Sequence, residues 1–211
     1  MSLRDRRVQY ETAGLDLGDL EASPIAQWQH WYDQAADGGV AEPNAMTVST
    51  IADDGAPDAR AVLVRAVDER GFVFFTNLLS RKAHELRHDP RAALTFYWPD
   101  FGQQVRIEGV VEAASEVEAD RYFRTRPRLS QLGSWASEQS QPLASREVLL
   151  ERMTSLSREF EGQPVPRPPH WGGLRLVPHR FEFWTAEPHR LNDRVVFERS
   201  GATWSKHLLY P

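Results

Sequence analysis

The sequence predicts a mainly β protein with inserted helices, folded as a closed or split antiparallel barrel. First, about seven or eight apolar segments have the length and composition of β-strands. Second, most of them follow one another directly across short turn sequences such as DDGAP and DERG, which indicate hairpins. Third, no predicted strand opens into a GxGxxG or GxxxxGK[ST] loop, which disfavours a doubly wound nucleotide-binding sheet.

The composition is that of an ordinary globular protein. The chain has 211 residues, of which 41% are hydrophobic and 26% charged, so it can bury a core without covalent staples. The net charge of −5 predicts no broad attraction to nucleic acid or membranes, so any anion site must be local. The chain lacks cysteine, a signal-peptide pattern and a membrane span, so we expect a cytoplasmic protein. We expect residues 1–22 to form an arm and residues 23–211 a single domain.

The first half of the expected domain begins with a helix. Ser23 is a good N-cap, Pro24 follows it at the first helical position, and Gly38 and Gly39 should end this helix. A meander of three strands is expected next, at residues 45–52, 59–67 and 72–77.

The second half alternates helices with strands. A short helix should run from Ser80 to the Asp89-Pro90 pair, before two strands at residues 91–98 and 102–114. Ser115 and Glu118 form a capping box that predicts a helix to about Phe123. Residues 124–142 read as a polar stretch, and Ser145 should begin another helix. The last expected strands are residues 174–177, 180–184, 194–199 and 203–207.

HELRH, at residues 84–88, matches the HExxH zinc pattern on a helix. Arg87 lies inside the pattern, and Arg81 and Lys82 lie one turn away, which disfavours a dication. No third ligand stands at a usual downstream spacing. We therefore interpret HELRH as a solvated helix face and expect no metal site.

The start of the same helix suggests an anion site. Arg81 and Lys82 occupy the first turn, where exposed N–H groups and the helix dipole already favour negative charge. For this stretch alone, pairing with surface carboxylates is the simpler interpretation. Basic residues recur, however, near aromatic and amide side chains, which together suit a flat, phosphorylated, heteroaromatic ligand. These basic residues are Arg60, Arg65, Arg126, Arg128, Arg190 and Arg194, near Gln104, Gln139 and Trp184.

Six ordered motifs resemble the pyridoxine/pyridoxamine 5′-phosphate oxidase family. They are RxVLxR, FFTN-x2-SRKA, QVxIxG, YFxxRPRxSQxGxWxSxQS, WGGxR and EFW-x5-RLxDR, and the similarity extends from about Arg7 to Pro211. The resemblance implies a split barrel that binds FMN as a homodimer, with sites at the subunit interface. It also implies hydride transfer from the substrate C4′ carbon to flavin N5, reoxidation by O2 and release of H2O2.

The resemblance assigns roles to individual residues. FMN would be bound by Arg60, Arg65, Phe75, Thr76, Arg81, Lys82, Gln104, Gln139, Ser140, Trp184 and Arg194. Pyridoxamine or pyridoxine 5′-phosphate would be bound by Arg7, Tyr10, Arg65, Tyr122, Arg126, Ser130, Arg190 and Asn192. Arg190 and Asn192 would also be the catalytic residues, placed against the pyridine ring.

Three positions depart from the family pattern. Arg65 stands where the family usually has lysine, Asn192 where it usually has histidine, and Phe75 where tyrosine is frequent. Asparagine forms hydrogen bonds but does not titrate. Two other functions therefore stay open: an FMN-dependent oxidase for another substrate, as in phenazine assembly, or a non-catalytic flavin- or pyridoxal-phosphate-binding protein.

Overall fold

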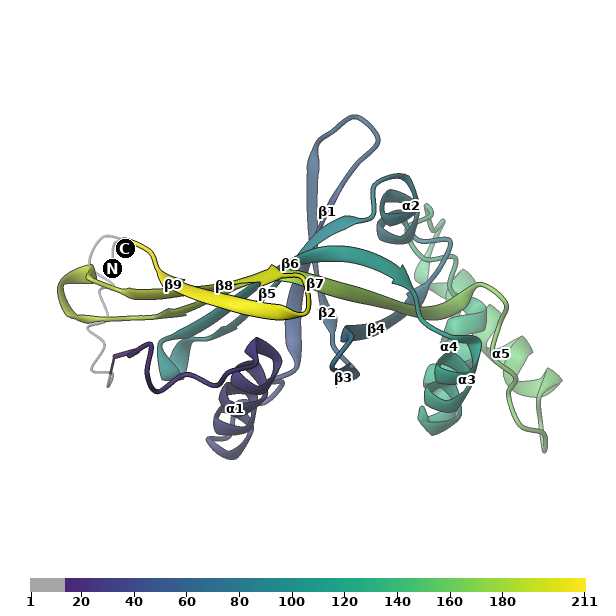
Figure 1. Cartoon of the computed structure of the whole chain (residues 1–211). Coiled ribbons are helices and arrows are strands. Elements are labelled where there is room, and N and C mark those ends of the chain that lie inside the picture. Colours follow the sequence, from purple (N-terminus) through teal and green to yellow (C-terminus); the bar gives the residue numbers. More distant parts are fainter. Residues whose placement is uncertain (1–13) are drawn as a thin grey trace, which may run out of the picture.

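The computed structural model describes residues 14–211 and confirms the antiparallel split-barrel fold. Nine strands form one curled sheet, with the order β2-β1-β5-β6-β7-β4-β3, and β8 and β9 continue from β7 (Figure 1). All strand pairs are antiparallel. The strands are β1 (Ala45–Ile51), β2 (Pro57–Leu63), β3 (Ala66–Asp68), β4 (Gly71–Asn77), β5 (Arg91–Trp98), β6 (Gln103–Ala113), β7 (Trp171–Thr185), β8 (Asp193–Ser200) and β9 (Thr203–Leu208).

Five α-helices accompany this sheet in residues 14–211. They are α1 (Pro24–Asp37), α2 (Arg81–His88), α3 (Glu116–Thr125), α4 (Arg128–Ala136) and α5 (Arg146–Glu159), with short 3-10 turns η2 (Pro99–Phe101) and η3 (Pro188–Arg190). Figure 1 shows α2 to α5 at one end of the molecule, whereas β8 and β9 extend toward the other end. None of the described helices is both long and apolar enough to cross a bilayer. The cytoplasmic location expected from the sequence stays a prediction.

The main core lies between α1 and the sheet. The Ser23 hydroxyl caps α1 by accepting a hydrogen bond from Ala26 N, which confirms the predicted start of this helix. Trp28 is buried and packs edge-on against Phe72 and Phe96, with ring centroids 5.1 Å away in both cases. Burial of these large rings supplies much of the apolar area that stabilises the sheet.

The strand expected at residues 59–67 is interrupted, and this prediction was wrong in detail. β2 ends at Leu63 and pairs with β1, whereas β3 begins at Ala66 and pairs with β4. The chain changes partner at this point, and Arg65 N donates to Val73 O. Strand alternation therefore does not govern the relative directions of Arg60 and Arg65.

Residues 124–142 were expected to be a polar stretch without a helix, but residues 128–136 form α4. Pro127 precedes the helix, and Leu132 and Ala136, four positions apart, are its buried residues. With only two buried positions the apolar period is too short to reveal the helix. The strands expected at residues 174–177 and 180–184 are one long strand, β7, which passes through Pro178 opposite a register shift at Glu108/Gly109.

The described part of the expected N-terminal arm contacts the C-terminal strands. Leu15 N donates to the Asp193 carboxylate, and Leu20 is buried. Lys206 Nζ donates to the carbonyl oxygens of Leu17 and Leu20, at 2.6 and 3.2 Å. Arg7 and Tyr10, expected to bind substrate, lie outside the described residues.

Candidate active site

Two adjacent cavities lie among β2, β4, α2 and the segment around α4. The large cavity has a volume of about 860 Å³ and the small cavity about 510 Å³. The large cavity is lined by the predicted cofactor residues Arg60, Phe75, Thr76, Arg81, Lys82, Gln139 and Ser140. The small cavity is lined by the predicted substrate residues Arg65, Tyr122, Arg126 and Ser130. Both share Val62, Leu63, Phe75, Arg126, Ser130 and Trp171, so ligands in the two cavities would touch.

Lys82 is a buried cation whose hydrogen-bond partners are neutral. Its ammonium group donates to Thr76 Oγ1 at 3.1 Å, Gln139 Oε1 at 3.0 Å and Ser80 Oγ at 3.4 Å. Burial lowers the Lys82 pKa below its ordinary value, and the nearby Arg60 charge lowers it further. A buried charge without a counter-ion is costly, so this arrangement is suited to an anionic ligand at the cavity wall.

Arg60 and Arg81 are held from behind by two carboxylates. Arg60 Nη2 donates to Asp58 Oδ2 at 2.6 Å and to Glu85 Oε2 at 3.0 Å. Arg81 Nε donates to Glu85 Oε1 at 2.8 Å and lies 3.2 Å from Asp58 Oδ2. Although burial opposes ionisation of Asp58, the Ala59 N–H group and the two arginines hold the Asp58 pKa below its ordinary value. Pairing with carboxylates, the simpler interpretation from sequence, is thus correct for Arg81.

The loop after α4 closes the large cavity over the start of α2. Ser140 Oγ accepts a hydrogen bond from Arg81 N at 3.2 Å, and Gln139 Oε1 accepts from Thr76 Oγ1 at 3.1 Å. Ser140 has a φ of 73°, in the left-handed region that non-glycine residues rarely occupy. Such strain is concentrated at functional sites, because the surrounding contacts must hold it in place. The Ser80 hydroxyl, expected to cap α2, forms no side-chain cap.

A cluster of three stacked aromatic rings lines the cavities. Phe75 stacks against both Tyr122 and Trp171, with centroid distances of 4.4 and 5.3 Å and interplanar angles of 19° and 6°, and the Tyr122 and Trp171 centroids are 6.1 Å apart. The Arg126 guanidinium lies 4.9 Å from the Trp171 ring centroid, and Arg65 lies 5.8 Å from that of Tyr122. Trp171 lines both cavities and was not among the predicted site residues, although the WGGxR motif contains it.

Arg126 is the central cation of the small cavity. Its Nη1 donates to Ser134 Oγ at 2.5 Å. Ser134, like Trp171, was not among the predicted site residues. No carboxylate of residues 14–211 forms an ion pair with Arg126 or Arg65. Burial lowers the Arg126 pKa, and the Arg65 charge lowers it further, although a guanidinium stays protonated. The small cavity thus has its own requirement for an anion.

The small cavity depends on α3, which ends next to Arg126. The Ser115–Glu118 capping box is present, as predicted. The Glu118 carboxylate also accepts from buried Arg175 on β7 at 2.8 Å, and Arg175 pairs with Asp68 of β3. This buried guanidinium joins α3 to β7 and β3, so it fixes where Tyr122 and Arg126 lie.

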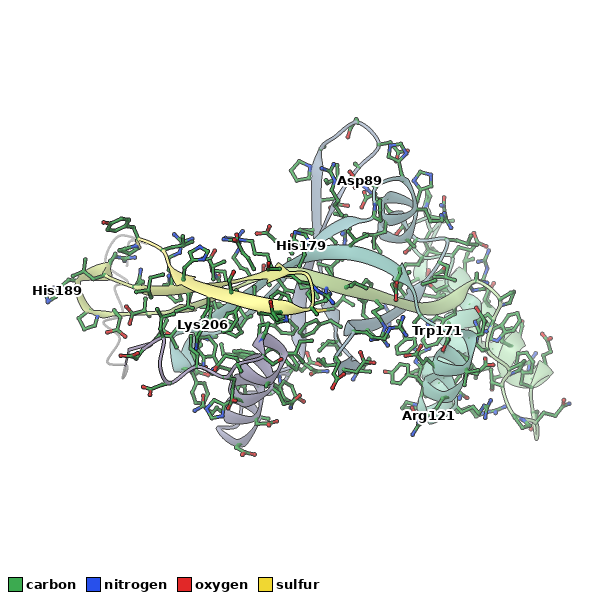
Figure 2. All side chains as sticks on the ribbon, viewed as in Figure 1. Asp89, Arg121, Trp171, His179, His189 and Lys206 are labelled. Carbon is green, nitrogen blue, oxygen red and sulfur yellow. The ribbon has the colours of Figure 1, made fainter. Side chains whose placement is uncertain are left out.

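The other predicted ligand residues lie toward the opposite end of the molecule. Gln104 and Arg194 flank Trp184 in the register of β6, β7 and β8. Figure 2 shows Trp171 beside the helices, whereas His189, in the turn that also holds Arg190, lies at the far tip (Figure 2). Because β7 spans residues 171–185, Trp171 and Trp184 are separated by roughly 40 Å along the strand. One chain therefore does not bring these residues to its own cavities.

Asn192 has a structural role in the turn at that tip. Its Oδ1 accepts a hydrogen bond from Glu187 N at 3.0 Å, which closes the loop between them. His189 and Arg190 inside the loop have φ values of 59° and 63°, so the backbone there is strained. The roles of Arg190 and Asn192 toward a ligand stay predictions.

The sequence predicted that HELRH is a solvated helix face, and this is only partly correct. The side chain of His84 is 60% exposed and His88 is exposed, but Glu85 is buried among arginines. The described residues contain no group of three or more histidine, aspartate and glutamate side chains arranged for a metal.

Family models match most of the chain. Residues 32–158 match the model described as pyridoxamine 5′-phosphate oxidase. Residues 171–211 match the model described as pyridoxine 5′-phosphate oxidase C-terminal dimerisation region.

Individual relatives agree with the family models. Pyridoxine/pyridoxamine 5′-phosphate oxidase of Rubrobacter xylanophilus is 50% identical over 97% of this chain and 94% of its own length. The protein of the same name from Cyanothece sp. is 47% identical over 100% of this chain and 99% of its own length.

Solved structures share the architecture. PhzG from Burkholderia lata, crystallised with tetrahydrophenazine-1-carboxylic acid, has a TM-score of 0.88 and 34% identity, covering 95% of this chain and 99% of its own. A pyridoxamine 5′-phosphate oxidase-related, FMN binding protein from Nostoc punctiforme has a TM-score of 0.71 at 16% identity, covering 91% of this chain and 100% of its own, and supports the fold alone.

Proposed function

Since the chain belongs to the pyridoxamine 5′-phosphate oxidase family, we propose that it oxidises pyridoxamine or pyridoxine 5′-phosphate to pyridoxal 5′-phosphate. FMN would be the cofactor, O2 the electron acceptor and H2O2 the second product. One observation carries the proposal: two adjacent cavities each contain cations that form no ion pair within residues 14–211, Lys82 in one and Arg65 and Arg126 in the other. Two phosphorylated ligands side by side would satisfy both.

The large cavity has the donor set for the FMN phosphate. Lys82 would supply a point charge, Arg60 and Arg81 planar guanidinium groups, and Ser140 a hydroxyl. The first turn of α2 adds backbone N–H groups at the positive end of the helix dipole. This arrangement would account for Lys82 at the start of α2, whose hydrogen-bond partners are neutral.

The small cavity suits the phosphate of the substrate. Arg126 and Arg65 would neutralise it, while Tyr122 and Ser130 offer hydroxyl donors. Arginine in place of the family's usual lysine keeps the charge of residue 65 and adds a second guanidinium fork.

The protein's part in catalysis would be to bind and align two rings. When bound, FMN supplies the two-electron oxidation of the substrate's C4′ carbon. The chain holds each phosphate with its own cations, so the ring systems meet at the shared wall formed by Phe75 and Trp171. Such alignment reduces the entropic part of the barrier.

A homodimer would complete the site. Five predicted ligand residues lie near the end of β7 that is far from the cavities, so they do not reach the cavities of their own chain. They are Gln104, Trp184, Arg190, Asn192 and Arg194. The match of residues 171–211 to a dimerisation region supports a second copy as the source of these residues. Each cavity pair would then receive the C-terminal residues of the partner chain.

An anaerobic half-reaction tests this function directly. Purified protein loaded with FMN is mixed with pyridoxamine 5′-phosphate while the flavin absorbance is followed. We expect the absorbance to bleach, and to return when air is admitted. An unchanged spectrum with FMN still bound would refute the proposed substrate.

The second candidate is an oxidase for a phenazine precursor, favoured by the 0.88 TM-score to PhzG and by Arg65 and Asn192. The 47–50% identity to the two named pyridoxine/pyridoxamine 5′-phosphate oxidases, against 34% to PhzG, favours the first. Bleaching by tetrahydrophenazine-1-carboxylic acid, but not by pyridoxamine 5′-phosphate, would reverse this order.

A further inference from the structure

Glu85 is a buried carboxylate directly behind the large cavity. It lies on α2 with 2% of its surface exposed, and it does not line the cavity. Its Oε2 accepts hydrogen bonds from Thr50 Oγ1 at 2.6 Å and Arg60 Nη2 at 3.0 Å, and its Oε1 accepts from Arg81 Nε at 2.8 Å. One carboxylate therefore joins β1, β2 and α2.

These contacts immobilise Arg60 in particular. A guanidinium has five N–H donors. Four contacts engage Nη1 and Nη2 of Arg60: Val48 O, Thr50 Oγ1, Asp58 Oδ2 and Glu85 Oε2. The orientation of the group is consequently set before any ligand arrives, which lowers the entropic cost of binding.

Burial of Glu85 is compensated by this network. Burial alone would favour the neutral acid, but hydrogen bonds from Thr50 and Arg81 and the Arg60 charge hold the Glu85 pKa below its ordinary value. The carboxylate is therefore ionised at neutral pH and accepts from both arginines at once.

We propose that Glu85, supported by Thr50, is a positioning residue that fixes the guanidinium groups of Arg60 and Arg81 to recognise the cofactor phosphate. This inference rests on the proposed function, in which the large cavity binds FMN. It explains why a negative side chain lies next to a site for a negative ligand.

Positioning and simple charge balance predict opposite results for Glu85→Gln. Removing a negative charge near the phosphate should tighten FMN binding if Glu85 only balanced charge. Glutamine, however, has one acceptor oxygen and a donor NH2 group, so one arginine would face a donor instead of an acceptor. If orientation is what matters, FMN binding should weaken.

The experiment compares FMN with riboflavin, which lacks the phosphate, in fluorescence titrations of apoprotein. For Glu85→Gln we expect the FMN Kd to rise by roughly 10- to 100-fold while the riboflavin Kd changes little. Thr50→Val removes one supporting hydroxyl and should change the FMN Kd in the same direction by a smaller factor. Glu112→Gln, which breaks the exposed pair with Arg70, is the matched control and should leave both Kd values unchanged.

The outcomes separate the inference from the function. Tighter or unchanged FMN binding in Glu85→Gln would overturn the positioning role, as would an equal loss of FMN and riboflavin affinity. If Glu85→Gln does not fold, Thr50→Val tests the inference in the same way: its FMN Kd should rise while its riboflavin Kd changes little. Failure of the unsubstituted protein to prefer FMN over riboflavin would instead refute the assignment of the large cavity.

Discussion

Replacing Arg126 by alanine should separate substrate binding from cofactor binding. Arg126 follows α3 and lines both cavities, next to Ser130. Its side chain contacts Ser134 Oγ and the rings of Trp171 and Phe123, but forms no ion pair within residues 14–211. Its charge is therefore available to the phosphate of the substrate.

The size of the effect follows from the bond that is lost. A hydrogen bond from a charged donor contributes about 1.5–3 kcal/mol. This free energy corresponds to roughly a 10- to 100-fold rise in KM. The phosphate is remote from the reacting carbon, so ground state and transition state lose the same interaction and kcat should change little.

Steady-state kinetics with pyridoxamine 5′-phosphate would measure this change, together with an FMN titration of each protein. Arg128→Ala is the matched control because Arg128, two residues further on, donates to the carbonyl oxygens of Phe160 and Gln163. We expect Arg128→Ala to leave KM unchanged.

Two results would contradict this reasoning. Loss of FMN without an effect on substrate KM would place Arg126 at the cofactor instead. A fall in kcat at unchanged KM would mean that the guanidinium acts in the chemical step.

Three further predictions concern the ligand sites and the fold. FMN binding should weaken as the pH rises, and at a lower pH than for an ordinary lysine, because burial lowers the Lys82 pKa and the neutral amine no longer attracts the phosphate dianion. Lys82→Arg should abolish this dependence in a fluorescence titration, and equal pH dependence in both proteins would contradict the prediction. Asn192→Ala should lower kcat/KM about tenfold, because the hydrogen bond from Glu187 N that closes the loop is lost. The shape of the pH–rate profile should stay the same, since an amide does not titrate. A shifted profile would count against a purely positional role of Asn192. Gly71→Ala should lower the free energy of unfolding in urea by about 3 kcal/mol, because φ is 133° and the added methyl group would overlap the backbone of β7. Gly39→Ala, where φ is 86° and the methyl group would point into open space, should lower it less. Equal decreases in the two variants would show that the overlap at Gly71 is relieved.

Local patterns were sufficient to predict most elements. The cap at Ser23 and the Ser115–Glu118 capping box depend on neighbouring residues only, and both are present. The anion site that Arg81 and Lys82 suggested at the start of α2 stays a prediction. Helix α4 escaped prediction because its apolar face is limited to Leu132 and Ala136.

Other features depend on segments that are distant in sequence. The break of the expected strand at Arg65 arises because β2 and β3 pair with different strands. Glu85 looked solvent-facing in HELRH, but its partners Thr50 and Arg60 lie 35 and 25 residues away.

What the sequence by itself determined is therefore the set of elements, the antiparallel fold class and the chemistry of the conspicuous motifs. Periodicity, capping and turn propensity act over a few residues and can be read locally. Only the tertiary structure decided that the two cavities adjoin and that Phe75, Arg126 and Trp171 line both of them. It also separated Trp184 from that cavity pair, because β7 carries Trp171 and Trp184 to opposite ends of one long strand.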